Sequence, residues 1–329
     1  MRGTLKTSTL ESKFPLLRVE NNCIISKFAD ITAAYRVLLP ELFTLTGEEY
    51  EALHGAWLKA LKVLPDYTVV HKQDFFIEER YETLNDGSER SFLARSYERH
   101  FNERPYLRHT CYLFVTKTTP ERMRQTSASS VLCRGFIVPR EMRDTDAVTR
   151  FLEAAEQMER ILNDSGLVRV ERLSEAEIVG TPEKAGILEK YFALTQDDTA
   201  ILQDMRLDPG RMQVGDKTLC LHTLSDLDDL PQKVSTDSRF ERLSTDRSDC
   251  RLSFAAPVGL LLSCDHIYNQ YIFLDNPAET FQQFEKRTRN LQSLSRYSRA
   301  NQINKEWLDQ FLNEGHNRGL TPVRGHCNV

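Results

Sequence analysis

The stretch Tyr268-Asn-Gln-Tyr-Ile-Phe273 and the residues that follow it decide how we interpret this 329-residue chain. Its aromatic and β-branched residues are typical of a strand. A long basic stretch with helical spacing follows, from Pro277 to about Asn317. The short segment Thr321–Val329 follows this stretch at the end of the sequence. We expect this segment to open a further unit, so that the sequence ends between two domains.

Toward the N-terminus, short strand and helix patterns alternate. Thr46 and Glu49 form a capping-box pattern at the start of one helix. A second, polar helix is predicted over residues 88–104, with Phe92, Leu93, Tyr97 and Phe101 on one side. A third opens at Asp144, carries apolar residues on one face and ends at Gly166. The predicted strands cover residues 17–27, 30–38, 67–77, 111–116 and 131–139, and residues 203–215 are expected to form a loop. This alternation predicts an α+β fold, in which mixed sheets of short, largely antiparallel strands pack with helices and a long helical segment comes last.

The length of the chain is typical of about two domains. We place an N-terminal α+β domain at residues 1–165. A second α+β region with the C-terminal helices covers residues 166–329. No internal repeat and no Gly/Ser-rich linker marks the boundary.

Composition restricts the class of protein. The formal net charge of -5 gives no global signature of nucleic-acid binding, so any contact with a polyanion requires a local patch. The seven cysteines are scattered and odd in number, which indicates reduced thiols in a cytosol-like compartment. The N-terminus lacks the apolar core of a signal peptide. No apolar run approaches the ~20 residues of a membrane span. We therefore expect a soluble protein.

Two stretches resemble nucleotide-binding motifs only in part. Gly210 to Thr218 has the glycines and lysine of a phosphate-binding loop, but Asp216 separates the second glycine from Lys217. An inserted carboxylate places negative charge where the phosphate should bind, so a surface hairpin turn is the better interpretation. The apolar stretch 260–265 ends in Asp265 like a magnesium-binding strand, but we expect only a buried strand that ends at a turn.

No other pattern points to catalysis. The eight histidines are dispersed and form neither H-x-x-x-H nor H-E-x-x-H, and G-x-S-x-G is absent. The carboxylates are too numerous for spacing alone to single out an acid–base pair. We predict no catalytic, cofactor-binding or metal-binding residue in this chain.

One compositional anomaly lies near the C-terminus. Between Phe281 and Lys305, Glu285 is the single acidic residue. The basic residues of this stretch form a candidate partner surface: Lys286, Arg287, Arg289, Arg296, Arg299 and Lys305. Two interpretations stay open. Amphipathic helices that pack on a core would leave a solvated basic face, whereas a functional surface would contact anionic lipid, nucleic acid or an acidic partner.

Several segments along the chain resemble the N-terminal region of the TraG proteins of Bacteroides-type conjugative transposons. Near the N-terminus they are Leu10-Glu-Ser-Lys-Phe-Pro-Leu-Leu17 and Glu20-Asn-Asn-Cys-Ile-Ile-Ser26. The middle of the chain contributes His71-Lys-Gln-Asp-Phe-Phe76, Tyr97-Glu-Arg-His-Phe-Asn-Glu-Arg-Pro105 and Tyr112-Leu-Phe-Val-Thr-Lys-Thr-Thr119. The C-terminal part adds Leu243-Ser-Thr-Asp-Arg-Ser-Asp249, Pro257-Val-Gly-Leu-Leu-Leu-Ser-Cys264 and Arg296-Tyr-Ser-Arg-Ala-Asn-Gln-Ile-Asn-Lys-Glu-Trp307.

The resemblance implies a conjugation ATPase of the type IV secretion class, which acts at the cytoplasmic face of the inner membrane. In such proteins a RecA-like motor holds ATP and Mg²⁺, and we expect it beyond Val329. What the resemblance implies for this chain is therefore a non-catalytic part that assembles with inner-membrane components of the DNA-transfer channel and contributes to subunit contacts. The alternative is a module that binds nucleic acid or anionic lipid through the basic C-terminal helices.

Overall fold

The fold is given by a computed structural model, which describes residues 9, 14–41, 44–81, 91–120, 145–199, 202–208, 210–224, 238–246, 249–253, 255–256, 259 and 261–329. Its helices are α2 (Gly47–Lys62), α3 (Phe92–Asn102), α6 (Thr145–Asp164), α7 (Glu175–Val179), α8 (Ile187–Ala193), α10 (Pro277–Leu294) and α11 (Arg299–Arg318). The strands of its main sheet are β1 (Leu16–Glu20), β2 (Cys23–Ser26), β3 (Ile31–Leu38), β4 (Thr68–Glu79), β5 (Tyr106–Lys117), β6 (Arg169–Arg172), β14 (His266–Leu274) and β15 (Arg324–Asn328). Smaller sheets are built from β7 (Gly180–Thr181) with β8 (Lys184–Ala185), β9 (Met205–Asp208) with β10 (Arg211–Val214) and β11 (Lys217–Leu219), and β12 (Ser238–Arg239) with β13 (Arg251–Leu252).

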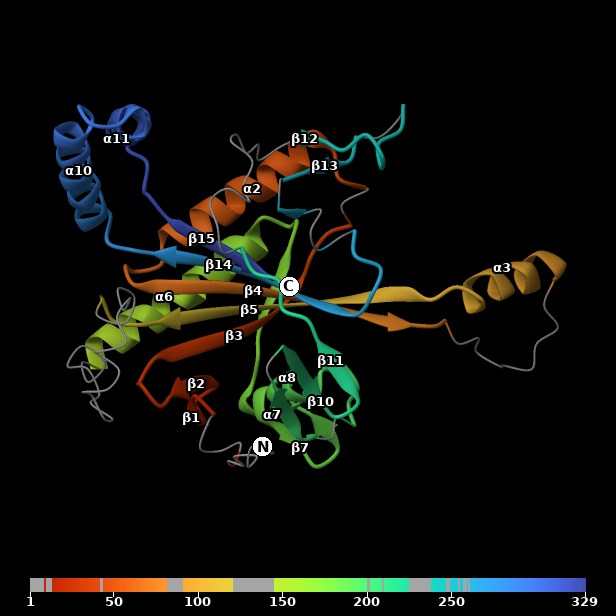
Figure 1. The fold of residues 1–329 in the computed structure, drawn as a ribbon. Coiled ribbons are helices and arrows are strands. Elements are labelled where there is room, and N and C mark those ends of the chain that lie inside the picture. The colour runs from red at the N-terminus through yellow and green to blue at the C-terminus, as the bar shows by residue number, and fades with distance from the viewer. Residues whose placement is uncertain are drawn as a thin grey trace, which may run out of the picture.

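One antiparallel sheet organises the molecule (Figure 1). Its strand order is β1-β2-β3-β5-β4-β14-β15, and β6 pairs with β3 beside β2. The strands β4 and β5 form a long hairpin that carries α3 at its far end, away from the helices α10 and α11 (Figure 1). Helices and antiparallel strands together make an α+β fold, as the sequence predicted.

Helices α2 and α6 cover one face of the sheet. Every second residue of β3, from Ala33 to Val37, points into the core on this side, as strand geometry requires. Phe151, Met158 and Leu162 of α6 are fully buried against these residues and against Leu113 of β5. This side therefore contains the larger hydrophobic core.

A smaller core lies on the opposite face. Phe75 of β4 and Tyr112 of β5 pack there edge to face, with ring centroids 5.9 Å apart. Ile178 of α7 and Ile187 of α8 close over them. The tyrosine hydroxyl also donates a hydrogen bond to the side chain of Gln196, at 3.4 Å. The two short helices thus cover only part of this face.

Local signals near the N-terminus mostly agree with the structure. The capping box of α2 is confirmed, because Glu49 N donates to Thr46 Oγ1 at 3.2 Å and Thr46 N donates to Glu49 Oε2 at 2.8 Å. The predicted strand 30–38 is confirmed as β3. The predicted strand 17–27 is instead two strands, since Asn21 and Asn22 adopt φ values of 53° and 57° and turn the chain between them. Asparagine tolerates this left-handed conformation better than most residues.

Four expectations from the sequence concern residues that follow β5. The stretch 203–215, expected to be a loop, contains β9 and β10. The turn expected at the incomplete phosphate-loop motif is confirmed, because Val214 pairs with Lys217 across Gly215 and Asp216. The buried strand predicted at 260–265 is wrong, since Leu261 and Leu262 are exposed and the strand begins at His266. The predicted strand 131–139 lies outside the described residues.

The main sheet draws strands from both predicted domains. Strands β1 to β5 belong to residues 1–165, whereas β6, β14 and β15 belong to residues 166–329. The boundary after residue 165 stays a prediction. The segment expected to open a further unit contains β15, which pairs with β14 from Asn269↔Asn328 to Phe273↔Arg324.

A charged cluster lies in the middle of the sheet, on the α2/α6 side. The Asp74 carboxylate accepts hydrogen bonds from Lys72 Nζ and, at 2.8 Å, from His109 Nε2. Its side chain is only 4% exposed. Burial alone would raise the pKa of Asp74, but the hydrogen bond from His109 and the charge of Lys72 hold this pKa below its usual value. The carboxylate therefore stays ionised inside the protein.

Replacing Asp74 should destabilise the fold strongly. Asp74→Asn leaves the half-buried Lys72 ammonium without its counter-charge, and we expect the free energy of unfolding to fall by about 3 kcal/mol. Urea denaturation followed by circular dichroism measures this change. Glu314→Gln, which removes an exposed partner of Arg318, should leave the unfolding midpoint unchanged. Equal midpoints for the two variants would contradict the role of the buried pair.

Candidate functional site

The predicted basic residues lie on a helical hairpin formed by α10 and α11, which is inserted between β14 and β15 (Figure 1). Phe273 of β14 and Arg324 of β15 are directly paired, so the two helices start and end at neighbouring strands. Arg324 also binds Asp275 through two hydrogen bonds, Nε to Oδ2 at 2.5 Å and Nη2 to Oδ1 at 3.0 Å. Such a two-point contact fixes orientation. The base of the hairpin is therefore held in place.

The N-terminus of α10 is fixed to the sheet by a second set of contacts. Asn276 caps the helix by accepting a hydrogen bond from Glu279 N at 3.1 Å. The same side chain donates to Asp66 Oδ2 at 2.6 Å, and Tyr67 donates to Glu279 Oε2 at 3.0 Å. These bonds join α10 to the turn before β4.

The two helices pack chiefly on each other. Phe284 and Phe311 meet edge to face with ring centroids 5.5 Å apart, and Phe281 stacks on His316 at 4.8 Å. Gly315 lies so close to Phe281 that a Cβ atom there would be 2.8 Å from the ring. The close approach at Gly315 lets the helices run together near the base. The opposite end consists of the turn 295–298 and the adjoining helix residues 286–294 and 299–308, and we call it the tip.

The structure brings all six predicted basic residues to the tip of the hairpin. Three lie on α10, Arg296 lies in the turn, and two lie on α11. Lys305 differs from the rest because it is half-buried and its Nζ lies 3.8 Å from Asp309. Within the described part of the chain, the hairpin's ion pairs join Lys305 to Asp309, His316 to Glu285 and Arg318 to Glu314. The other five predicted residues are exposed and take part in none of these pairs.

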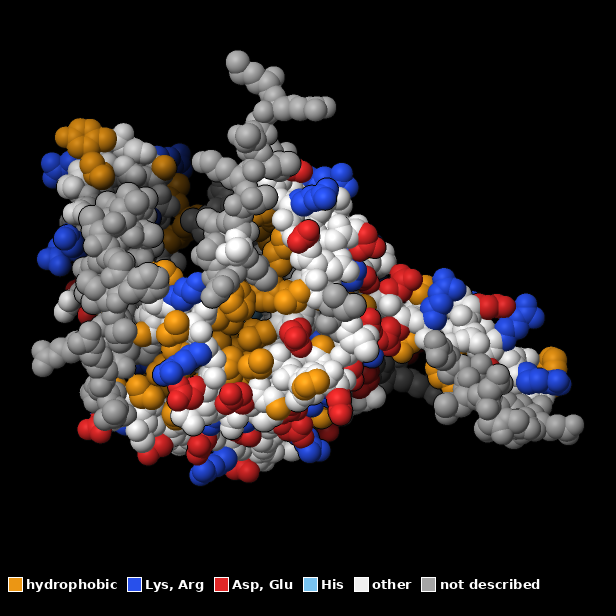
Figure 2. Space-filling view, turned by 90° about the horizontal axis from the view of Figure 1, so that it is seen from below, with side chains coloured by type: hydrophobic (Ala, Val, Ile, Leu, Met, Phe, Trp, Pro, Cys, Tyr) orange, Lys and Arg blue, Asp and Glu red, His pale blue; other side chains and the backbone are white. Residues whose placement is uncertain are grey.

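Exposed apolar side chains accompany the basic ones, which sequence reasoning did not anticipate. Spacing alone left open whether Trp307 packs on a core; the structure leaves it 64% exposed. Tyr297, in the turn, is 85% exposed. Figure 2, viewed from below Figure 1, shows hydrophobic side chains beside Lys and Arg side chains at this end of the molecule. The tip is therefore both basic and apolar.

The helix α3 presents a second apolar surface at the opposite end of the molecule (Figure 1). The sequence predicted a helix with Phe92, Leu93, Tyr97 and Phe101 on one side. In the structure Phe92 and Leu93 are 75% and 78% exposed, although helix and spacing agree with the prediction. Amphipathic spacing alone does not tell whether the apolar side is covered.

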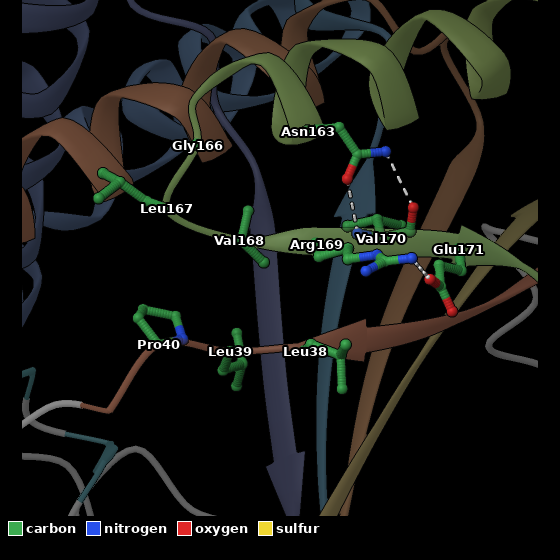
Figure 3. Close-up of a pocket in the computed structure, with 10 residues that line it drawn as sticks. All are labelled: Leu38, Leu39, Pro40, Asn163, Gly166, Leu167, Val168, Arg169, Val170 and Glu171. Atoms are coloured by element: carbon green, nitrogen blue, oxygen red, sulfur yellow. Dashed lines mark hydrogen bonds and ion pairs between the residues drawn. The ribbon is translucent and has the colours of Figure 1, made fainter.

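A hollow of about 620 Å³ lies between the end of β3 and the start of β6 (Figure 3). Asn163, one of its lining residues, joins α6 to β6 by donating to Val170 O at 2.9 Å and accepting from Val170 N at 2.8 Å. Arg169 and Glu171 pair with each other at 2.5 Å. These polar groups already bind within the chain, so they hold α6 against β6 and do not indicate a ligand site.

The described residues provide no arrangement typical of a catalytic or metal site. They contain no group of three or more His, Cys, Asp or Glu side chains that could hold a metal ion. Lys217, the lysine of the incomplete phosphate-loop motif, donates to the carbonyl of Leu194 at 2.6 Å. The six cysteines of the described residues are free. Among the helices described, none has the length and apolar character needed to cross a bilayer.

Comparison with known families gives one match, to residues 3–55, which lie at the N-terminal end and include β1, β2, β3 and part of α2. The matched family is described as "Domain of unknown function, B. Theta Gene description (DUF3875)". The match covers less than a fifth of the chain. No curated protein matches the sequence.

The close packing at Gly315 can be tested directly. In Gly315→Ala the new methyl group meets the Phe281 ring, and the cost of overpacking should exceed the helix-propensity gain of about 1 kcal/mol. We expect faster amide hydrogen exchange in α10 and α11, with exchange in β3 and β5 unchanged. Gly55→Ala in α2 adds a methyl group to open space and should not speed exchange anywhere. Slower exchange in the hairpin of Gly315→Ala would contradict this packing.

Proposed function

We propose that this chain is the non-catalytic assembly and docking part of a TraG-type conjugation ATPase, which energises DNA transfer through a type IV secretion channel. The proposal rests first on the resemblance of segments spread along the chain, three of which lie in β4, β5 and the α10–α11 hairpin. The family match at residues 3–55 carries a description that refers to a B. Theta gene, which is compatible with a Bacteroides-type element.

The observation that carries the docking role is the hairpin itself. Its base is fixed by Asp275 and Arg324, while its tip projects from the sheet (Figure 1). The exposed side chains there are basic and aromatic. Trp307 is not exposed alone, because Leu294, Tyr297 and Ile303 of the same hairpin are exposed as well, and grouped apolar side chains of this kind are typical of interaction surfaces. We propose that the tip meets the inner-membrane components of the channel at the cytoplasmic face, and that ATP and Mg²⁺ bind in a motor outside residues 1–329.

A second candidate function is nucleic-acid binding by the same hairpin. It is favoured by the run from Lys286 to Lys305, which contains six basic residues and no acidic one. This candidate predicts an affinity for DNA that falls steeply with salt.

Docking is tested with the channel's inner-membrane proteins, co-expressed with this chain and extracted in detergent. We expect an affinity-tagged chain to co-purify with them, and Arg287→Gln/Arg289→Gln/Arg296→Gln to reduce the yield about tenfold. The control Arg150→Gln/Arg160→Gln/Arg169→Gln removes the same charge from exposed positions elsewhere and should keep the yield. Equal yields from both variants would exclude the hairpin as the docking site.

Absence of catalysis is tested on the purified chain. We expect no magnesium-dependent ATP hydrolysis above background, because Lys217 begins β11 directly after Asp216 and donates to the carbonyl of Leu194. ATP turnover that Lys217→Ala abolishes would overturn the proposal.

A further inference from the structure

One side of α11 carries a stripe of apolar residues, and most of them do not contact α10. Arg299, Ile303, Trp307 and Phe311 follow one another at intervals of four residues, so they lie along one side of α11. The buried residues of α11 are different ones, Leu312 and Gly315, and Gly315 lies against Phe281 of α10. Ile303 and Trp307 are exposed, and Phe311 is partly covered by Phe284. The stripe therefore begins at Arg299, is exposed at Ile303 and Trp307, and reaches the contact with α10 at Phe311.

The turn extends this stripe with both kinds of side chain. Tyr297 is the most exposed large apolar residue of the hairpin, and Leu294 before it is also exposed. Arg296 and Arg299 flank the tyrosine and are exposed as well. Exposed aromatic and cationic side chains thus occur together at the tip, a combination typical of segments that lie in the interfacial region of a bilayer.

Nucleic acid fits the shape and charge of the hairpin less well than a flat anionic surface does. Single strands bind in positively charged grooves. The hollow along α10 is lined by Glu279 and Glu285 as well as by Lys286 and Arg289, so its carboxylates would repel a phosphate backbone. The tip, by contrast, is a projecting end formed by two helices and a turn (Figure 1), which suits contact with a flat surface.

We propose that the tip of the α10–α11 hairpin binds an anionic bilayer directly, with Tyr297, Ile303 and Trp307 entering the headgroup region and Arg287, Arg296 and Arg299 pairing with lipid phosphates. The proposal rests on the docking role for its location at a membrane and adds lipid as a partner. The fixed base at Asp275 and Arg324 would hold the sheet at a set distance from the bilayer.

The test uses the full chain with Trp57→Phe, which leaves Trp307 as the one tryptophan of the sequence. Its fluorescence is measured with vesicles of phosphatidylcholine, with or without phosphatidylglycerol. We expect a shift to shorter wavelength with the anionic vesicles alone, and quenching by lipids that are brominated on the acyl chain near the headgroup. Arg287→Gln/Arg296→Gln/Arg299→Gln in this background should weaken binding on the order of 100-fold.

Two controls make the result decisive. Arg150→Gln/Arg160→Gln/Arg169→Gln lowers the net charge equally and should bind the vesicles as before. Trp307→Ala in the otherwise unchanged chain should reduce co-sedimentation with anionic vesicles while circular dichroism stays the same. An unshifted Trp307 spectrum on both kinds of vesicle would overturn the proposal, as would a shift with single-stranded DNA but not with vesicles.

The docking experiment is carried out in detergent without a bilayer. A failure of docking is therefore distinguishable from a failure to bind lipid.

Discussion

The pairing of β4 with β14 is the constraint on which the rest of the structure depends. Nine residue pairs, from His266↔Phe76 to Leu274↔Thr68, join segments almost two hundred positions apart in the sequence. Without this pairing β14 and β15 would lose their connection to the strands of the N-terminal region, because β15 pairs with β14. The pairing also fixes where β14 ends. It therefore determines the position of the hairpin that follows.

The charged cluster at Asp74 lies on the same strand, directly opposite Tyr268 of β14. A buried ion pair contributes little net stability, because desolvation offsets most of the attraction, but breaking one is costly. A shift of one residue along β4 would turn Asp74 to the other face, where Phe75 and Tyr112 form the smaller core. The cluster thus penalises alternative registers of the central strands. It contributes specificity more than stability.

Local sequence signals could predict much of the fold but not the candidate site. The capping box at Thr46 and the apolar face of α6 depend on residues a few positions apart, and both agree with the structure. The division into β1 and β2 depends on the φ angles of Asn21 and Asn22, which strand propensity does not reveal. The pairing of β15 with β14 depends on a chain reversal through two helices. Long-range pairing is set by tertiary contacts, so the sequence alone led us to expect that Thr321–Val329 opens a further unit, whereas its residues from Arg324 to Asn328 pair with β14.

Because spacing does not reveal tertiary contacts, the sequence also could not predict which apolar residues of the α10–α11 hairpin are exposed. An i, i+4 apolar pattern predicts a helix with one apolar side whether that side meets a core, a partner or a membrane. For α10 the pattern is satisfied within the hairpin, where Phe281 and Phe284 meet α11. For α11 the stripe through Ile303 and Trp307 lies outside that contact, and burying a side chain of this kind is worth about 2 kcal/mol. A protein that holds such groups exposed on a fixed base gains that free energy only when something binds there. The neighbouring cations then favour a partner with negative charge over a neutral apolar one.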